Sequence, residues 1–160
     1  MQVLVTGATG FWAGAVARRM QGLGSSRGAR AAIQMRVRRC RRRACFARLD
    51  LVHEGAAERA LEGCDAVVHC AALSSPLGLA RDSGMNNVYA THRPLAAAQT
   101  AGVRRFCAHL DAGVSGGRGQ SFGSARGRAL PRRLANHYVR SKLEAEGLVQ
   151  QASGRVVCPP

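Results

Sequence analysis

A short apolar run that ends in a glycine-rich turn limits the fold of this chain more than any other feature. Residues 3–5 are Val, Leu and Val, glycines follow at positions 7, 10 and 14, and a helix is predicted from Ala13 to Met20. Gly7 permits the tight turn, Gly10 lets backbone N–H groups approach a phosphate, and Gly14 lets the helix pack on the strand. A diphosphate would rest at the helix N-terminus, where unpaired N–H groups and the helix dipole favour negative charge. The alternative is a tight strand-to-helix turn that binds no ligand.

Length and composition set the broad class. A chain of 160 residues fits one domain with a core of its own. It contains no apolar run of about 18 residues, so we expect no membrane span. The chain starts directly in a strand, without a signal sequence, so we expect a cytoplasmic protein. The six cysteines form no Cys-x-x-Cys pair and no His-Cys cluster at metal spacing, so no metal is expected.

The net charge of +15 is made almost entirely of arginine. Of the 24 basic residues, only Lys142 is a lysine. Near-exclusive arginine beside abundant alanine and glycine is typical of a very GC-rich gene, whereas a functional basic surface usually mixes arginine and lysine. The charge is therefore weak support for a nucleic-acid partner.

Strands alternate with helices along most of the chain. Further strands are predicted at residues 31–37, 44–49, 65–71, 103–109 and 154–158, and further helices at 54–61, 84–101 and 134–151. Residues 22–30 are predicted to form a loop. This alternation predicts an α/β fold with a doubly wound parallel sheet, a Rossmann fold, covered by helices on both faces. We expect one dinucleotide-binding domain over residues 1–160, with irregular Arg/Gly-rich stretches near 25–48 and 110–130.

The second chemical signal lies in the last predicted helix. Tyr138 and Lys142, the only lysine of the chain, are four residues apart, so both side chains would lie on one face of the helix. A nearby cation stabilises a phenolate, and a tyrosine in this setting can exchange a proton with a substrate oxygen near neutral pH. The alternative is an exposed helix with an incidental pair.

Several motifs now identify a family resemblance. The chain resembles the extended short-chain dehydrogenases/reductases, the group of NAD-dependent epimerases and dehydratases and of 3β-hydroxysteroid dehydrogenase-like enzymes. The resemblance covers residues 1–22, 49–109 and 134–152. It is carried by Thr6-Gly7-Ala8-Thr9-Gly10-Phe11, Asp50-Leu51, Cys64-Asp65-Ala66-Val67-Val68-His69-Cys70-Ala71-Ala72, Asn87-Val88, Gly102-Val103-Arg104-Arg105-Phe106 and Tyr138-x-x-x-Lys142.

The resemblance implies roles for individual residues. Tyr138 would be the acid/base, and Lys142 would bind the nicotinamide ribose and tune Tyr138. Asn87 would brace the active site, although a polar residue at a helix start is an equally good interpretation. His69 is interpreted as a core histidine with satisfied hydrogen bonds. The remaining cofactor contacts would come from Gly7, Thr9, Gly10, Phe11, Trp12 and Gly14 at the diphosphate, Asp50 and Leu51 at the adenine, and Ala71 and Ala72 at the end of the fourth strand.

The chain also departs from the family pattern. No acidic residue ends the second strand, where the family selects NAD or NADP, although Arg36 or Arg38 could accept a 2′-phosphate. The serine segment after the fifth strand is missing, and Ser115 is the nearest hydroxyl, outside the family register. The chain stops at Pro160, where the family continues into a substrate lobe. We therefore expect a truncated chain with impaired activity. One interpretation is that the chain is the remnant of a frameshifted gene.

Two function classes follow. The first is an NAD(P)-dependent oxidoreductase, epimerase or dehydratase that acts on a hydroxyl or carbonyl of a small substrate such as a sugar nucleotide or steroid. The second is a non-catalytic nucleotide-binding or basic nucleic-acid-associating remnant, whose feature is the arginine cluster at residues 36–43. The expected partners are NAD or NADP and a small-molecule substrate, and the chain could also form a homodimer. We expect no membrane partner and no nucleic-acid partner.

Overall fold

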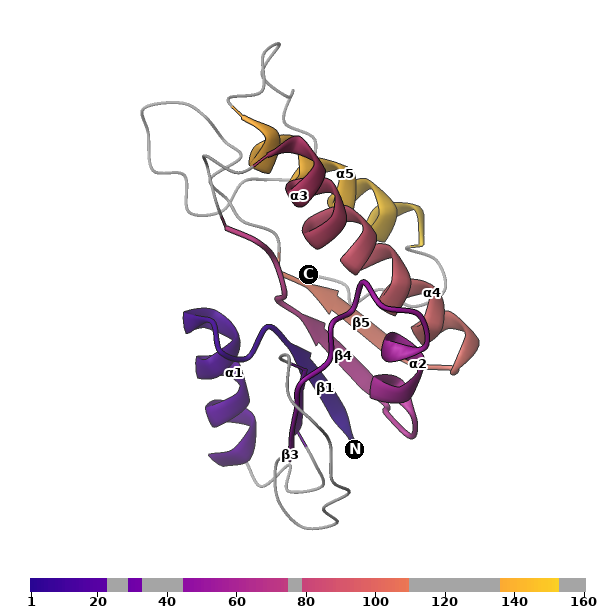
Figure 1. Cartoon of the computed structure of the whole chain (residues 1–160). Helices are drawn as coiled ribbons and strands as arrows, with labels where there is room; N and C mark the ends of the chain where they lie inside the picture. The colour runs from indigo at the N-terminus through magenta and orange to yellow at the C-terminus, as the bar shows by residue number, and fades with distance from the viewer. Residues whose placement is uncertain (23–28, 33–44, 75–78, 110–135, 153–160) are drawn as a thin grey trace.

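The computed structural model describes residues 1–22, 29–32, 45–74, 79–109 and 136–152 (Figure 1). Along these segments strands and helices alternate. The elements are β1 (Val3–Thr6), α1 (Phe11–Gly22), β2 (Ala29–Ala32), β3 (Cys45–Ala47), α2 (Ala56–Leu61), β4 (Ala66–His69), α3 (Ala80–Ser83), the π-helical segment η1 (Gly84–Tyr89), α4 (Ala90–Thr100), β5 (Arg105–Ala108) and α5 (His137–Gln151).

The strands of the described segments form one sheet in the order β3-β2-β1-β4-β5. Each pair of neighbouring strands is parallel. The chain moves outward from β1 through β2 to β3, and then returns to the other side of β1 for β4 and β5. The predicted doubly wound Rossmann fold is therefore confirmed. In such a sheet a crevice opens at the carboxyl ends of the strands where the order reverses, which here lies between β1 and β4.

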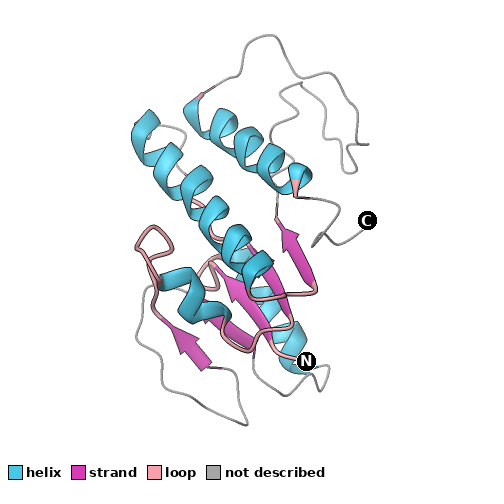
Figure 2. Ribbon diagram, turned by 90° about the vertical axis from the view of Figure 1, so that its right-hand side faces the viewer, coloured by secondary structure: helices cyan, strands magenta, loops and turns pink. Residues whose placement is uncertain are grey.

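Helices cover both faces of this sheet (Figures 1 and 2). Leu4, Val67 and Phe106 are aligned across β1, β4 and β5 and pack in one core cluster with α2, α4 and α5. Val3 and Val5 point to the opposite face of the sheet, where they pack with Ala8 and with Ala13 of α1. This alternation is the period of two that an extended strand imposes on its side chains. Both faces of β1 are thus buried, which fits its uniformly apolar start.

Some predicted boundaries were wrong. Helix α1 begins at Phe11, two residues before the predicted start. Strand β2 begins at Ala29, inside the predicted loop 22–30, and ends at Ala32. The Arg/Gly-rich composition there carries no strand period, and pairing with β1 and β3 determines the strand instead. The predicted strand 154–158, most of the predicted strand 31–37 and the stretch 110–130 lie outside the described residues.

The predicted helix 84–101 is part of a longer helical run that begins at Ala80. Its first predicted residues, Gly84–Tyr89, are π-helical, and the α-helical portion runs from Ala90 to Thr100. A π-helical turn contains more residues than the 3.6 of an α-helix, so a pattern based on 3.6 residues does not detect it. Among the described helices, none is long and apolar enough to cross a membrane.

Candidate active site

The glycine turn after β1 lies against the end of β4. Gly7 has a positive φ of 71°, and a Cβ at this position would lie 2.7 Å from the backbone N of Ala71. A residue with a side chain would therefore be strained in its backbone and would also collide with the chain after β4. A Cβ on Gly10 would lie 3.1 Å from the Gly7 carbonyl oxygen. The turn is thus closed by backbone packing, as the sequence predicted for Gly7.

The outer part of the same turn faces solvent. Thr9, Gly10, Phe11 and Trp12 are exposed, whereas Gly14 is buried. The N–H of Gly10 donates to the Gly7 carbonyl at 2.8 Å, and the N–H of Gly14 donates to the Gly10 carbonyl at 2.9 Å. The first N–H groups of a helix have no acceptor within the helix, so this edge presents donors and the positive end of a dipole. These residues fit a diphosphate, which such helix starts commonly bind.

A buried hydrogen-bond relay connects this turn to the helical layer. The hydroxyl oxygen of Thr6 accepts from the backbone N–H groups of Cys70 and Ala71, each at 3.1 Å. The same oxygen lies 2.8 Å from Nδ1 of His69, and Nε2 of His69 lies 3.0 Å from the hydroxyl of Thr91. The relay therefore runs from the end of β1 through β4 to α4.

The donor and the acceptor of each hydrogen bond in the relay follow from the bonds at its two ends. The Thr91 hydroxyl donates to the Asn87 carbonyl at 2.6 Å, so it accepts from His69, whose proton must then be on Nε2. Nδ1 is left to accept from the hydroxyl of Thr6. Burial, helped by the positive charge of Lys142, lowers the pKa of His69 from 6.5 to about 3. The interpretation of His69 as a core histidine with satisfied hydrogen bonds is confirmed.

Asn87 joins three segments at the centre of the site. Its side chain is 1% exposed. The Oδ1 atom accepts from the backbone N–H of Leu73 at 2.7 Å, and Nδ2 donates to the Leu73 carbonyl at 3.3 Å and to the Ser141 hydroxyl at 2.9 Å. The Asn87 amide thus fixes the chain after β4 against α5. These contacts are the ones that a bracing role requires, and that role stays a prediction.

Helix α5 places Tyr138 and Lys142 beside the end of β5. Its N-cap, Asn136, accepts from the N–H of Val139 at 2.9 Å, which fixes where the helix begins. Lys142 is 7% exposed, and its Nζ donates to the carbonyl of His109 at 3.2 Å. Tyr138 is half-buried one helical turn earlier. A buried ammonium is costly unless it is paired, so its retention here points to a specific role.

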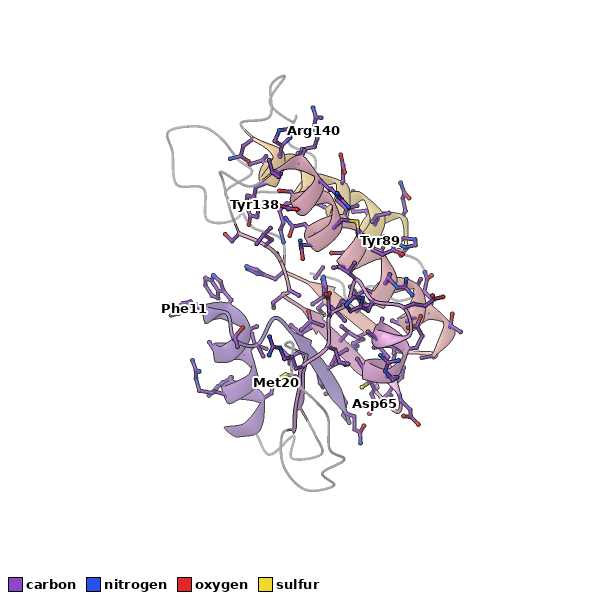
Figure 3. The ribbon with its side chains drawn as sticks, in the orientation of Figure 1. Phe11, Met20, Asp65, Tyr89, Tyr138 and Arg140 are labelled. Carbon is purple, nitrogen blue, oxygen red and sulfur yellow. The ribbon has the colours of Figure 1, made fainter. Side chains whose placement is uncertain are left out.

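The side chains of the glycine turn and of the end of β5 also meet. The Trp12 ring lies 5.6 Å from the His109 ring, centroid to centroid. Figure 3 shows Phe11 and Tyr138 toward the end of the sheet to which the strands point, and Asp65 at the opposite end. Asp65 there accepts from the N–H of Gln2 and from Arg104, at 2.6 and 3.1 Å. Phe11 and Tyr138, two of the predicted site residues, therefore lie toward the carboxyl edge of the sheet.

The other predicted site residues are placed as follows. Asp50 follows β3, and its carboxylate accepts from the N–H of Val52 at 3.0 Å. Leu51 is buried in the core cluster, so its predicted contact with adenine stays a prediction. Ala71 is half-buried and Ala72 is exposed at the end of β4. Ser115 lies outside the described residues, so its catalytic role stays a prediction.

Some residues of the site were not predicted. Thr6, Thr91, Ser141 and His109 all bond to predicted site residues or to His69. Thr91 lies one helical turn after Asn87, and Ser141 lies three residues after Tyr138, so helical spacing could have suggested both. No sequence signal identifies His109 as the hydrogen-bond partner of Lys142, because the two residues belong to separate elements.

Comparison with known families identifies this chain. Residues 3–158 match the model of the NAD dependent epimerase/dehydratase family, and the chain belongs to that family. A search of the curated proteins found no match. The finer resemblance to 3β-hydroxysteroid dehydrogenases is not supported by a specific match.

Solved structures share the fold at low identity. MoeE5 in complex with UDP-glucuronic acid and NAD is 28% identical, with a TM-score of 0.78, over 97% of this chain and 50% of its own. A short-chain dehydrogenase/reductase superfamily protein from Agrobacterium tumefaciens with bound NAD is 27% identical, with a TM-score of 0.77, over 98% of this chain and 47% of its own. UDP-glucuronic acid 4-epimerase from Bacillus cereus, at 21% identity and a TM-score of 0.74, shares the fold over 95% of this chain and 52% of its own. This chain thus spans about half the length of these structures.

Proposed function

We propose that this chain binds NAD or NADP along the carboxyl edge of its sheet. The diphosphate would lie at the start of α1, against the exposed turn of Thr9 and Gly10, with the adenine toward Asp50 and the nicotinamide ribose toward Lys142. Support comes from the backbone closure at Gly7 and from the position of Lys142 at the opposite side of the switch point. The solved relatives named above contain NAD. Arg36 and Arg38, the candidates for a 2′-phosphate, lie outside the described residues, so NAD and NADP both remain within the proposal.

We further propose an oxidoreductase, epimerase or dehydratase activity in which Tyr138 is the acid/base. The observation that carries this proposal is the buried Lys142 one helical turn from Tyr138, held by the His109 carbonyl. When bound, the nicotinamide ring supplies hydride acceptance and return. Tyr138 would take the proton from a substrate hydroxyl or return it to a carbonyl oxygen, and the charge of Lys142 would favour the phenolate. Asn87 and Ser141 keep α5 in position for this transfer.

The proposed substrate is a sugar nucleotide. One solved relative, MoeE5, is described in complex with UDP-glucuronic acid, which supports this class over a steroid. Because the chain spans about half of that relative, substrate binding and turnover by this chain belong to the proposal. Ser115 is retained as the second hydroxyl that would polarise the substrate oxygen.

Turnover on a panel of sugar nucleotides in the presence of NAD tests the activity, with the sugar-nucleotide product measured by chromatography and any net oxidation measured as NADH absorbance. Tyr138→Phe should lower turnover by a hundredfold or more, because a positioned acid/base contributes roughly 10²–10⁴-fold. Lys142→Met should lower it as well. Tyr89→Phe and Arg140→Met are the matched controls, since Tyr89 is the other tyrosine and Arg140 is an exposed cation on the same helix. Unchanged turnover in Tyr138→Phe would refute the assignment of the acid/base.

A further inference from the structure

Three aromatic rings are in contact at the carboxyl edge of the sheet, two from the start of α1 and one from the residue after β5. Phe11 meets Trp12 edge-on at 5.8 Å, and Trp12 meets His109 at 5.6 Å with an angle of 36° between the ring planes. Phe11 is 81% exposed and Trp12 is 62% exposed. Large aromatic side chains that are this exposed and gathered in one place are typical of surfaces that a ligand covers.

The Trp12–His109 contact spans the switch point of the sheet. Trp12 lies in the first turn of α1, directly after β1, whereas His109 follows β5. Strand β4 lies between β1 and β5, so the two rings meet across its carboxyl end. The backbone of His109 is fixed on both sides, because its N–H donates to the His69 carbonyl at 2.8 Å and its carbonyl accepts from Lys142 at 3.2 Å. Trp12 therefore leans against an anchored residue.

The position of the Trp12–His109 pair indicates which half of a bound dinucleotide would lie against it. Asp50, the predicted adenine contact, follows β3 at the opposite edge of the sheet. Lys142, the proposed ribose contact of the nicotinamide half, is joined to His109 itself. A flat, exposed indole whose neighbour His109 also contacts Lys142 suits an aromatic ring placed in this half, and offset stacking of two aromatic rings is favourable.

We propose that the side chain of Trp12, backed by His109, is the stacking surface for the nicotinamide ring of the bound cofactor. This inference rests on the proposed cofactor function and adds a side-chain contact that the backbone of the glycine turn does not supply. His109 acts as a positioning residue, because it limits the orientations of the indole rather than reaching the cofactor itself. The two residues should therefore be energetically coupled in binding the nicotinamide half alone.

Calorimetric titration with NADH and with ADP-ribose, which lacks the nicotinamide ring, tests the inference. Trp12→Ala should weaken NADH binding roughly tenfold, a loss typical of one stacked ring, and change ADP-ribose binding by less than about twofold. His109→Ala should weaken NADH binding less, and the double variant should lose little more than Trp12→Ala alone. Tyr89→Ala is the control, because Tyr89 is an exposed aromatic side chain away from the crevice (Figure 3).

Each outcome is decisive. Equal losses for NADH and ADP-ribose in Trp12→Ala, or no loss for either, overturn the stacking role but leave the proposed cofactor site in place. If the wild type prefers NADPH, the same titrations use NADPH and 2′-phospho-ADP-ribose. Wild-type protein that binds neither NADH nor NADPH overturns the proposed function and this inference together. Binding of ADP-ribose by the variants shows that they are folded, so a selective loss of NADH affinity cannot come from misfolding.

Discussion

The buried His69 should make the stability of the fold fall steeply in mild acid. Its ring is fully enclosed, both nitrogens are hydrogen-bonded, and its pKa is lowered to about 3, whereas an unfolded chain protonates the same ring near 6.5. Below pH 6.5 the unfolded state therefore binds a proton that the folded state does not. The stabilising effect is complete above pH 6.5 and is lost as the pH falls from there toward 3.

The magnitude follows from the two pKa values. Each pH unit in this window costs about 1.4 kcal/mol, so His69 alone should remove about 2 kcal/mol of unfolding free energy between pH 7 and pH 5. Urea unfolding followed by circular dichroism at both pH values gives the total change for the wild type. His69→Gln, which does not titrate in this range, gives the change from all other groups, and the difference isolates His69.

A matched variant controls for histidine content. His92 is exposed on α4 next to Thr91, so His92→Gln should keep the wild-type dependence on pH. His69→Gln will be less stable at both pH values, because the relay loses a partner, but its loss between them should be about 2 kcal/mol smaller than that of the wild type. An equal loss in wild type and His69→Gln would show that His69 is accessible to protons in the folded state, and would refute the buried relay.

Two further pairs of substitutions test the local geometry by urea unfolding at pH 7. Gly7→Ala should cost about 3 kcal/mol or more, because it adds a collision with Ala71 to the strain of a positive φ, whereas Gly102→Ala, with φ of 67° and open space, should cost about 1 kcal/mol; similar costs would contradict the collision. Asn87→Ala should cost about 3 kcal/mol by removing three hydrogen bonds of a buried amide. Asn86→Ala, whose exposed amide has one bond, should cost less than about 1 kcal/mol, and an equal cost for both would exclude the bracing role of Asn87.

The fold could be predicted because its pattern is local. Apolar strands such as Val3–Val5 and 65–71 separate amphipathic helices, and right-handed crossovers leave few ways to arrange such units. The glycine spacing at 7, 10 and 14 and the Tyr138–Lys142 spacing are also local, so they were visible in the sequence. Both lie at the carboxyl edge of the sheet, as parallel strands require.

The contacts that organise the site depend on long-range pairing and could not be predicted. Thr6 and His69 are 63 residues apart in the sequence, and Asn87 and Ser141 are 54 apart. Their hydrogen bonds exist only because β1 pairs with β4 and η1 packs against α5. The π-helical segment brings Asn87 to this junction, and neither propensity nor a period of 3.6 residues signals it.

In the proposed function, the glycine turn after β1 holds the diphosphate of a dinucleotide. Calorimetric titration of NAD and NADP into the wild type and Gly10→Val tests it most directly, with circular dichroism to verify that the variant is folded. A valine at this exposed position, whose Cβ lies 3.1 Å from the Gly7 carbonyl, projects from the surface that the diphosphate would approach. We expect saturable binding by the wild type and affinity at least tenfold weaker in Gly10→Val. Equal affinity in the two proteins, or no binding by the wild type, would contradict it.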